Sequence, residues 1–372
     1  MNNLFKNNEV NVKPKQATNI SSNNISKSSL MTNNSISKSM KKTNSATLIN
    51  KKTYNSPSSI KSTNVNIAKS EQNEQVIKKI KCMHDISKTG LCGDEKKVNQ
   101  DNYFIFKNFA NSFENIYMGV CDGHGFYGHE VSGYIRENLP MDLNHIINNK
   151  QVNLQQDREM LFEIIQETFV YENNLLLKNK MIDSTLSGST CVSVIYTPYK
   201  LIVANLGDSR CILGKLKNGK WSSKMLSRDH KPNVPEEAER IKSRGGRIRP
   251  MKDEEGNFIG PLRVYMRDKD MPGLAMTRSF GDSFASTAGT ISVPEVKEYM
   301  FEKEDKFMIL ASDGLFEFIN NDEIINIVKD FYLKNEIVGC CEFLYNESCR
   351  RWIEEEEDTI DDITIIVVFF EN

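Results

Sequence analysis

From about residue 80 onward, the chain alternates between short apolar runs and longer amphipathic stretches. The short runs are rich in β-branched and aromatic residues and have the length of single strands, which predicts β-structure. They are residues 103–106, 116–121, 190–196, 200–205, 211–216, 221–226, 296–301, 307–311 and 364–370. Turn sequences at residues 197–199 and 217–220 separate neighbouring runs, so we expect these neighbours to pair antiparallel.

The amphipathic stretches predict helices because their apolar residues recur every three to four positions. They are residues 128–148, 158–178, 235–243, 321–333 and 337–353. Strand runs occur in blocks separated by paired helices, which favours antiparallel sheets covered by helices over a regular βαβ array. Residues 246–290 show little regular pattern, and we expect a long functional loop there.

The beginning of the chain differs from the rest in composition. Residues 1–70 contain 11 Lys, no Arg, one acidic residue, 15 Asn and 14 Ser, so their net charge is +10 and the remainder carries −12. Such a segment cannot bury enough apolar surface to offset its ordering entropy. We therefore predict a disordered basic tail at residues 1–75 and a globular domain at residues 76–372. The tail could bind acidic surfaces, be phosphorylated on serine, or be a solvated extension without a partner.

The same composition argues against several classes of protein. No stretch approaches the roughly 20 apolar residues of a membrane helix, so we expect no membrane span. The tail lacks interleaved aromatic residues and the body is acidic, so we expect no nucleic-acid partner. The eight cysteines are scattered, several inside apolar runs, which indicates reduced thiols. We expect a monomer located in the cytoplasm, with the nucleus as an additional site.

Four aspartates far apart in the chain lie where apolar runs meet small or turn-forming residues: Asp101, Asp122, Asp313 and Asp361. A strand that ends in Asp-Gly presents a carboxylate at the rim of a sheet and leaves the next carbonyl accessible. Several such ends that converge would form an all-oxygen site, which suits hard cations such as Mg²⁺ or Mn²⁺. A pair of such ions is a device for hydrolysing phosphate esters.

A series of short motifs in fixed order carries a resemblance to a known family. The motifs are VNQD (98–101), DGHG (122–125), SGST (187–190), NLGDSR (205–210), DHKP (229–232), RGG (244–246), GLAMTRSFGD (273–282), VPEV (293–296), ASDG (311–314) and DDIT (361–364). Over residues 80–371 the chain resembles the metal-dependent serine/threonine protein phosphatases, the PPM or type 2C family. The resemblance implies an α+β fold, a four-layer αββα sandwich in which two antiparallel β-sheets pack face to face between helix pairs.

The resemblance also implies a dinuclear metal site. Asp122 would bridge two Mg²⁺ or Mn²⁺ ions, and the Gly123 carbonyl would bind one of them. Asp313 and Asp361 would complete the other ion, and Asp101 would hold the site directly or through water. The ions would activate a water that attacks phosphorus in line.

Further roles follow from the same resemblance. His124 would protonate the departing serine or threonine oxygen, a task that suits an imidazole with a pKa near 6.5. Asp208 and Glu317 match positions that hold a third metal ion in some members, although Asp208 could equally cap a hairpin turn. Lys96 stands where the family commonly has an arginine that binds the substrate phosphate. Lysine offers no planar two-pronged clamp, and Lys97 could serve instead if the register shifts by one.

Two other positions depart from the family pattern. Gln100 replaces a frequent glutamate, which removes one charge near the metals. Asp362 stands where asparagine is usual, so the chain has an acidic pair at residues 361 and 362. We expect Asp361 to be the ligand and Asp362 to support it, although the two roles could be exchanged.

We therefore expect an enzyme that hydrolyses phosphoserine and phosphothreonine monoesters in phosphoprotein substrates. Cysteine-dependent phosphatases need an arginine six positions after the cysteine, and none of the eight cysteines has one. A phosphatase-shaped regulator without catalysis would lose metal carboxylates, whereas all four are present. A two-metal nuclease or small-molecule phosphatase is a further alternative, because the metals alone do not exclude it.

Overall fold

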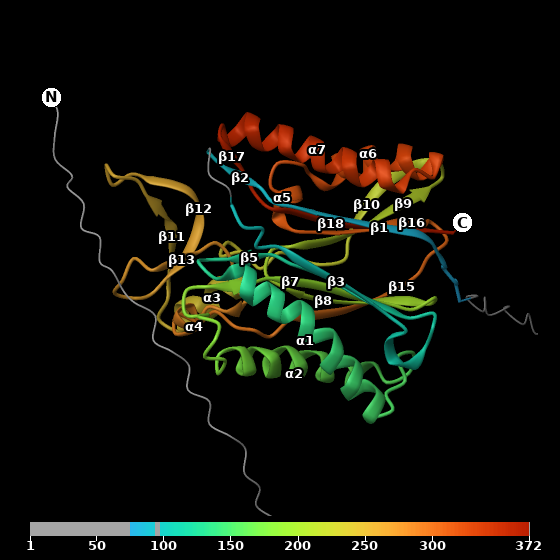
Figure 1. Ribbon diagram of the computed structural model, residues 1–372, viewed down its shortest axis with the longest axis horizontal. Coiled ribbons are helices and arrows are strands. Elements are labelled where there is room, and N and C mark those ends of the chain that lie inside the picture. The colour runs from blue at the N-terminus through green and yellow to red at the C-terminus, as the bar shows by residue number, and fades with distance from the viewer. Residues whose placement is uncertain (1–74, 94–96, 372) are drawn as a thin grey trace, which may run out of the picture. The chain divides into compact units, whose positions relative to one another are not determined.

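The computed structural model describes residues 75–93 and 97–371 (Figure 1). The tail that we predict at residues 1–75 lies outside the described residues except for its last position. Lys96 also lies outside the described residues. Within the described part of the chain, no helix combines the length and the apolar character that a bilayer span needs.

Two five-stranded antiparallel sheets form the centre of the described residues. The first sheet has the order β1 (Ile80–Lys88), β18 (Ile363–Phe370), β16 (Asp305–Ala311), β9 (Arg210–Lys217) and β10 (Lys220–Met225). The second has the order β15 (Glu295–Met300), β8 (Lys200–Leu206), β7 (Cys191–Tyr196), β4 (Ile116–Cys121) and β3 (Asn102–Lys107). The predicted antiparallel pairing across the two turn sequences is confirmed for β7 with β8 and for β9 with β10.

The burial of β18 explains why the two sheets share a core. Ile365 and Val367 belong to a cluster with residues of the nearby helices, whereas Ile366 and Val368 belong to a cluster with residues of the second sheet. Successive side chains of a strand point to opposite faces, so a continuous apolar run is what a strand covered on both sides requires.

Helices cover the outer faces of both sheets (Figure 1). Helices α1 (Gly128–Asn149) and α2 (Arg158–Leu176) pack on the second sheet, and α6 (Asn321–Lys334) and α7 (Ile337–Glu356) pack on the first. A capping box of Asn320 and Glu323 starts α6, and Asn335 ends it in the left-handed conformation. The predicted strands and helices are all present, with ends shifted by a few residues.

Residues 246–290 form regular structure, so our prediction of a long loop there was wrong. Strands β11 (Arg247–Lys252), β12 (Phe258–Tyr265) and β13 (Pro272–Leu274) pair as a three-stranded antiparallel sheet, which we call the small sheet. The first five of the eight residues of β12 are exposed. Period-two alternation arises only when one face of a strand is buried, so this strand left no such pattern in the sequence.

Short elements connect these layers. They are β2 (Leu91–Cys92), the 3₁₀ helix Phe109–Asn111, β5 (Gly123–His124), β6 (Gly188–Ser189), α3 (Pro235–Ser243), β14 (Phe280–Gly281), α4 (Ser283–Ser286), α5 (Asp313–Phe316) and β17 (Thr359–Ile360). Strands β14, β6 and β5 form a second three-stranded sheet, and β17 pairs with β2. The β14–β6–β5 sheet matters for function because it brings together three of the motifs noted in the sequence.

Candidate metal centre and active site

The four aspartates lie at strand ends that belong to both large sheets. Asp101 precedes β3 and Asp122 follows β4, whereas Asp313 follows β16 and Asp361 lies two residues before β18. Ser312 joins the two sides, because its Oγ donates a hydrogen bond to Asp101 Oδ2 at 2.7 Å. The structure therefore brings Asp101 next to the strand end that carries Asp313, and the charges of Asp101, Asp313 and Asp361 all act on Asp122, although these residues are far apart in the sequence.

The carboxylates of the aspartates influence one another electrostatically. Burial raises the pKa of Asp122 well above its usual value, and the charge of Asp313 raises it further. Burial also raises the pKa of Asp313, together with the charges of Asp208 and Asp361. The pKa of Asp101 rises to about 7, mainly through burial. Carboxylates gathered in this way are stabilised by bound protons or by a cation.

The donor atoms fit a hard divalent cation. They are carboxylate oxygens together with the carbonyl of Gly123, the type of ligand that Mg²⁺ and Mn²⁺ prefer. A Cβ atom at Gly123 would lie 2.3 Å from the carbonyl oxygen of Gln100 and 2.4 Å from that of Gly128, so only glycine permits this close approach. Asp208 Oδ1 is buried without a hydrogen-bond partner among the described residues. Within those residues, no three His, Cys, Asp or Glu side chains are already gathered in a metal-holding group.

The neighbouring aspartates Asp361 and Asp362 have different surroundings. Asp362 is buried, and its carboxylate accepts hydrogen bonds from the backbone N–H groups of Gly90 at 2.7 Å and Gln100 at 2.8 Å. Asp361 is partly exposed and accepts a hydrogen bond from Lys97 Nζ at 2.8 Å. Burial alone would lower the pKa of Lys97, but the charge of Asp361 raises it. Asp362 thus fixes the backbone around the site, whereas Asp361 forms the shorter of the two contacts with Lys97.

His124 lies beside the aspartates and forms a pair with Asp282. The distance between His124 Nε2 and Asp282 Oδ2 is 2.7 Å, and Ser279 Oγ donates to the same carboxylate oxygen at 2.6 Å. Burial alone would lower the pKa of His124, but the charge of Asp282 raises it. The other ring nitrogen, Nδ1, is buried and has no hydrogen-bond partner in the described part of the chain.

The β14–β6–β5 sheet holds this pair together. His124 in β5 is opposite Gly188 in β6, and β14 leads directly into Asp282. A Cβ atom at Gly188 would lie 2.2 Å from Asp282 Oδ2 and 2.6 Å from His124 Nε2. Asp282 is a candidate residue that sequence reasoning missed. Its only signal was its place at the end of the motif at residues 273–282, after a glycine.

Asp208 lies in the turn between β8 and β9, where it forms an ion pair with Lys231. Burial alone would lower the pKa of Lys231, but the charges of Asp208 and Asp313 raise it. Glu317 follows α5 and is exposed. Lys231 is therefore an internal cation at the edge of the carboxylate group, which sequence reasoning missed.

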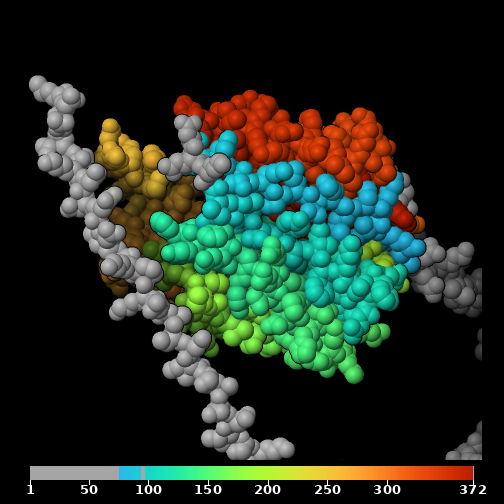
Figure 2. Space-filling view, in the orientation of Figure 1, coloured from blue at the N-terminus to red at the C-terminus, as the bar shows by residue number. Residues whose placement is uncertain are grey.

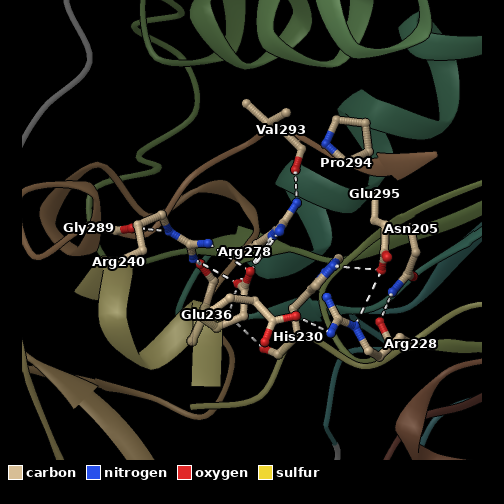
Figure 3. Close-up of polar contacts among 12 residues, drawn as sticks. Asn205, Arg228, His230, Glu236, Arg240, Arg278, Gly289, Val293, Pro294 and Glu295 are labelled. Atoms are coloured by element: carbon tan, nitrogen blue, oxygen red, sulfur yellow. Dashed lines mark hydrogen bonds and ion pairs between the residues drawn. The ribbon is translucent and has the colours of Figure 1, made fainter. Parts of the chain in front are cut away.

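A buried ionic network braces the segment that leads to Asp282 (Figure 3). Glu237 of α3 accepts hydrogen bonds from Arg240 Nη1 at 2.8 Å and from Arg278 Nη2 at 2.6 Å. Arg278 also donates to the carbonyl oxygen of Val293 at 2.8 Å. Burial would raise the pKa of Glu237, but these hydrogen bonds hold it far below its usual range. The ionised carboxylate therefore ties the segment before Asp282 to α3.

Comparison with known proteins assigns the family. The family description "Protein phosphatase 2C" matches residues 90–355 of the chain. The chain belongs to the protein phosphatase 2C family. Among similar sequences, Probable protein phosphatase 2C 65 from Arabidopsis thaliana is 34% identical over 288 residues, which cover 74% of each chain. Probable protein phosphatase 2C 72 from the same plant is 32% identical, over 74% of this chain and 83% of its own.

Solved structures agree on the fold. The serine-threonine phosphatase 2C from Toxoplasma gondii superposes with a TM-score of 0.66 at 19% identity, and the match covers 78% of this chain and 94% of that one. As a protein phosphatase 2C, the chain is an enzyme that dephosphorylates proteins, and dependence on Mg²⁺ or Mn²⁺ is a general property of its family. The predicted family is thus confirmed.

Proposed function

We propose that this protein phosphatase 2C hydrolyses phosphoserine and phosphothreonine monoesters in proteins, with a water activated at a dinuclear Mg²⁺ or Mn²⁺ site as the nucleophile. The observation that carries the proposal is the gathering of strand-end aspartates around Asp122, whose pKa is raised by burial and by the charges of Asp313, Asp101 and Asp361. When bound, the ions would also neutralise charge on the phosphoryl oxygens.

The chain's own residues have distinct tasks in this reaction. Asp101, Asp122, Asp313 and Asp361, with the Gly123 carbonyl, would hold the ions. His124 would give a proton to the departing serine or threonine oxygen, because an alkoxide is a poor leaving group. Its Nε2 is bound to Asp282, so Nδ1, which is buried and has no hydrogen-bond partner among the described residues, is the ring nitrogen left to give that proton.

Asp282 is a positioning residue in this scheme. Its carboxylate fixes the orientation of the His124 ring and favours the protonated imidazole that a general acid requires. Lys97 pairs with Asp361, and we propose that it binds the substrate phosphate with Lys96 or in its place. We also propose a third ion held by Asp208 and Glu317, which would have to displace Lys231 from Asp208.

The proposal extends to the architecture and the state of the protein. The shared core between the sheets and the helix pairs on their outer faces support the four-layer αββα sandwich. The eight cysteines form no disulfide, which supports a reducing location such as the cytoplasm, with or without the nucleus. We propose that the enzyme acts as a monomer, which analytical ultracentrifugation would test.

A metal-titrated assay tests the function. Purified full-length protein is freed of metal with chelator and then mixed with phosphoserine, phosphothreonine or phosphotyrosine peptides at increasing Mg²⁺ or Mn²⁺. We expect phosphate release from the first two peptides only after metal is added. Asp313→Ala should reduce turnover by at least a hundredfold, because a metal ligand is lost.

Asp330→Ala is the matched control, since Asp330 is an exposed aspartate on α6 away from the site. This variant should retain wild-type turnover. Full turnover in excess chelator, or equal turnover by Asp313→Ala and Asp330→Ala, would contradict the proposed mechanism. A preference for phosphotyrosine would contradict the proposed substrate class.

A further inference from the structure

A cavity of about 300 Å³ opens beside the His124–Asp282 pair. One wall comes from the segment before β6 and includes Leu186, and the other comes from the small sheet and the segment that follows it. The small sheet lies at one end of the described domain, where its β11–β12 part is the gold surface in Figure 2. His124 and Asp282 line the cavity, so the cavity is continuous with the proposed active site.

The lining of the cavity is mainly apolar. Leu186 is 43% exposed and Met271 is 42% exposed, although both are large apolar side chains. Leu274 of β13 and Met276, which follows β13, add further apolar surface to the cavity. Methionine adapts its shape to different apolar partners, which suits a wall that receives side chains of variable form.

One polar group of the cavity wall has an unused donor. Arg263 of β12 donates from Nη1 to the carbonyl oxygen of Gly273 at 2.8 Å, which holds the guanidinium against β13. Its Nε–H is buried and has no hydrogen-bond partner among the described residues. A buried donor without a partner is unfavourable, so a ligand carbonyl that reaches this group would gain a hydrogen bond.

We propose that this cavity is a substrate subsite that receives the apolar side chain of a residue next to the phosphorylated serine or threonine, and that Arg263 Nε donates to a carbonyl of the same peptide. The inference rests on the proposed function, because it uses His124 to place the phosphorylated residue. Successive Cα atoms lie about 3.8 Å apart, so a peptide with its seryl oxygen at His124 brings a neighbouring residue to the cavity.

The volume of the cavity agrees with such an occupant. An engineered cavity of about 150 Å³ binds benzene, so about 300 Å³ accommodates a leucine, methionine or phenylalanine side chain with part of the attached backbone. A lysine neighbour would lose hydration against the apolar wall without gaining an ion pair, and a glutamate would have to compete for Arg263 with the Gly273 carbonyl that holds its guanidinium. The enzyme should therefore prefer phosphopeptides with an apolar neighbour over otherwise identical peptides with a charged one.

The experiment compares kcat/KM for phosphothreonine peptides that carry Leu, Glu or Lys immediately before or after the phosphorylated residue. For the metal-loaded full chain, we expect kcat/KM to be about tenfold higher for Leu than for Glu or Lys on at least one side. Met271→Glu should lower the ratio of kcat/KM for the Leu peptide to kcat/KM for the Lys peptide about tenfold, because the new carboxylate attracts the lysine side chain. Arg263→Gln should raise KM for all peptides alike, because every peptide has the carbonyl.

Met251→Glu is the matched control. Met251 is 47% exposed on β11 of the same small sheet but does not line the cavity, so this variant should keep the wild-type ratio. Equal kcat/KM for Leu, Glu and Lys on both sides would overturn the inference, as would the same change of ratio in Met271→Glu and Met251→Glu.

Binding measurements separate this inference from the proposed function. Fluorescence anisotropy with the same labelled peptides reports the preference without turnover. Tighter binding of Leu peptides by a protein that releases no phosphate would support the subsite and refute the proposed reaction. Metal-dependent phosphate release without any peptide preference in binding or turnover would support the proposed reaction and refute the subsite.

Discussion

The geometry of the proposed general acid, His124, depends on Gly188. A methyl group there would lie far inside contact distance of both His124 Nε2 and Asp282 Oδ2, so the pair must move apart. Displacement of a catalytic group by about 1 Å can cost about a hundredfold in rate. We therefore expect Gly188→Ala to lower kcat for a phosphoserine peptide by roughly 10- to 100-fold.

The leaving group distinguishes this effect from general damage. Nitrophenolate leaves without a proton, so Gly188→Ala should reduce turnover of p-nitrophenyl phosphate much less than turnover of the peptide. Gly133→Ala on α1 is the control, because the nearest atom to an added Cβ is 3.9 Å away and alanine favours a helix. An equal loss on both substrates would show that Gly188 supports the fold and not the proton transfer.

Single residues differ in how far the sequence alone reveals their roles. Asp122 and His124 could be predicted because they lie in one short motif, DGHG. The partner of His124 could not, because Asp282 is 158 positions away and only the β14–β6–β5 sheet brings the two together. The presence of Lys97 beside Asp361 is also a consequence of tertiary structure, since either of two adjacent lysines fitted the motif.

At the scale of elements, α1 and α2 enclose an acidic residue that titrates in an unusual range. Glu172 is fully buried, and Tyr134 donates a hydrogen bond to it at 3.2 Å. Burial, with the nearby Asp142, raises the pKa of Glu172 from 4.5 to about 8. The folded state thus binds a proton that the unfolded state releases between these pH values, so stability falls as pH rises from about 4.5 to 8.

Glu172→Gln replaces the carboxyl group with a neutral amide of the same shape. We expect it to raise the melting temperature by about 2–4 °C at pH 8 and to change it little at pH 4.5, where the wild-type carboxyl is already protonated. Differential scanning calorimetry at both pH values gives the measurement. Glu167→Gln, an exposed substitution on the same helix, should change neither value. An equal rise in the melting temperature of Glu172→Gln at pH 4.5 and at pH 8 would contradict a raised pKa of Glu172.

The elements themselves show what periodicity can predict. Helices and strands with one buried face follow the sequence pattern, because burial imposes a period of 3.6 or 2. Strand β1 has no such pattern, since most of its residues are half-buried on both faces, and the small sheet has even less. The proposed subsite is built on the small sheet, where the hydrophobic pattern of the sequence is weakest.

At the scale of the whole molecule, the proposed metal centre lies where the two large sheets meet. Asp101 and Asp122 flank strands of the second sheet, and Asp313 and Asp361 flank strands of the first. Neither sheet alone provides the site, so sequence motifs could suggest the ligands but not their convergence. An ion bound there would hold the sheets together as well as serve the reaction.

Metal binding should therefore stabilise the whole domain. A ligand at 100 times its dissociation constant stabilises the folded state by about 2.7 kcal/mol, so saturating Mg²⁺ should raise the melting temperature of chelated protein by roughly 5 °C or more. Asp313→Asn should abolish most of this rise. Without metal, the same variant should be more stable than the wild type, because one of the mutually repelling carboxylates has become neutral.

This opposite pair of effects separates a metal centre from an acidic cluster with a structural role. A structural carboxylate held by hydrogen bonds would lose stability on neutralisation, with or without Mg²⁺. Differential scanning fluorimetry at constant ionic strength measures both quantities, and Asp330→Asn should follow the wild type in each. If Asp313→Asn lowers the melting temperature in chelator and keeps the full response to Mg²⁺, the four aspartates do not form a common cation site.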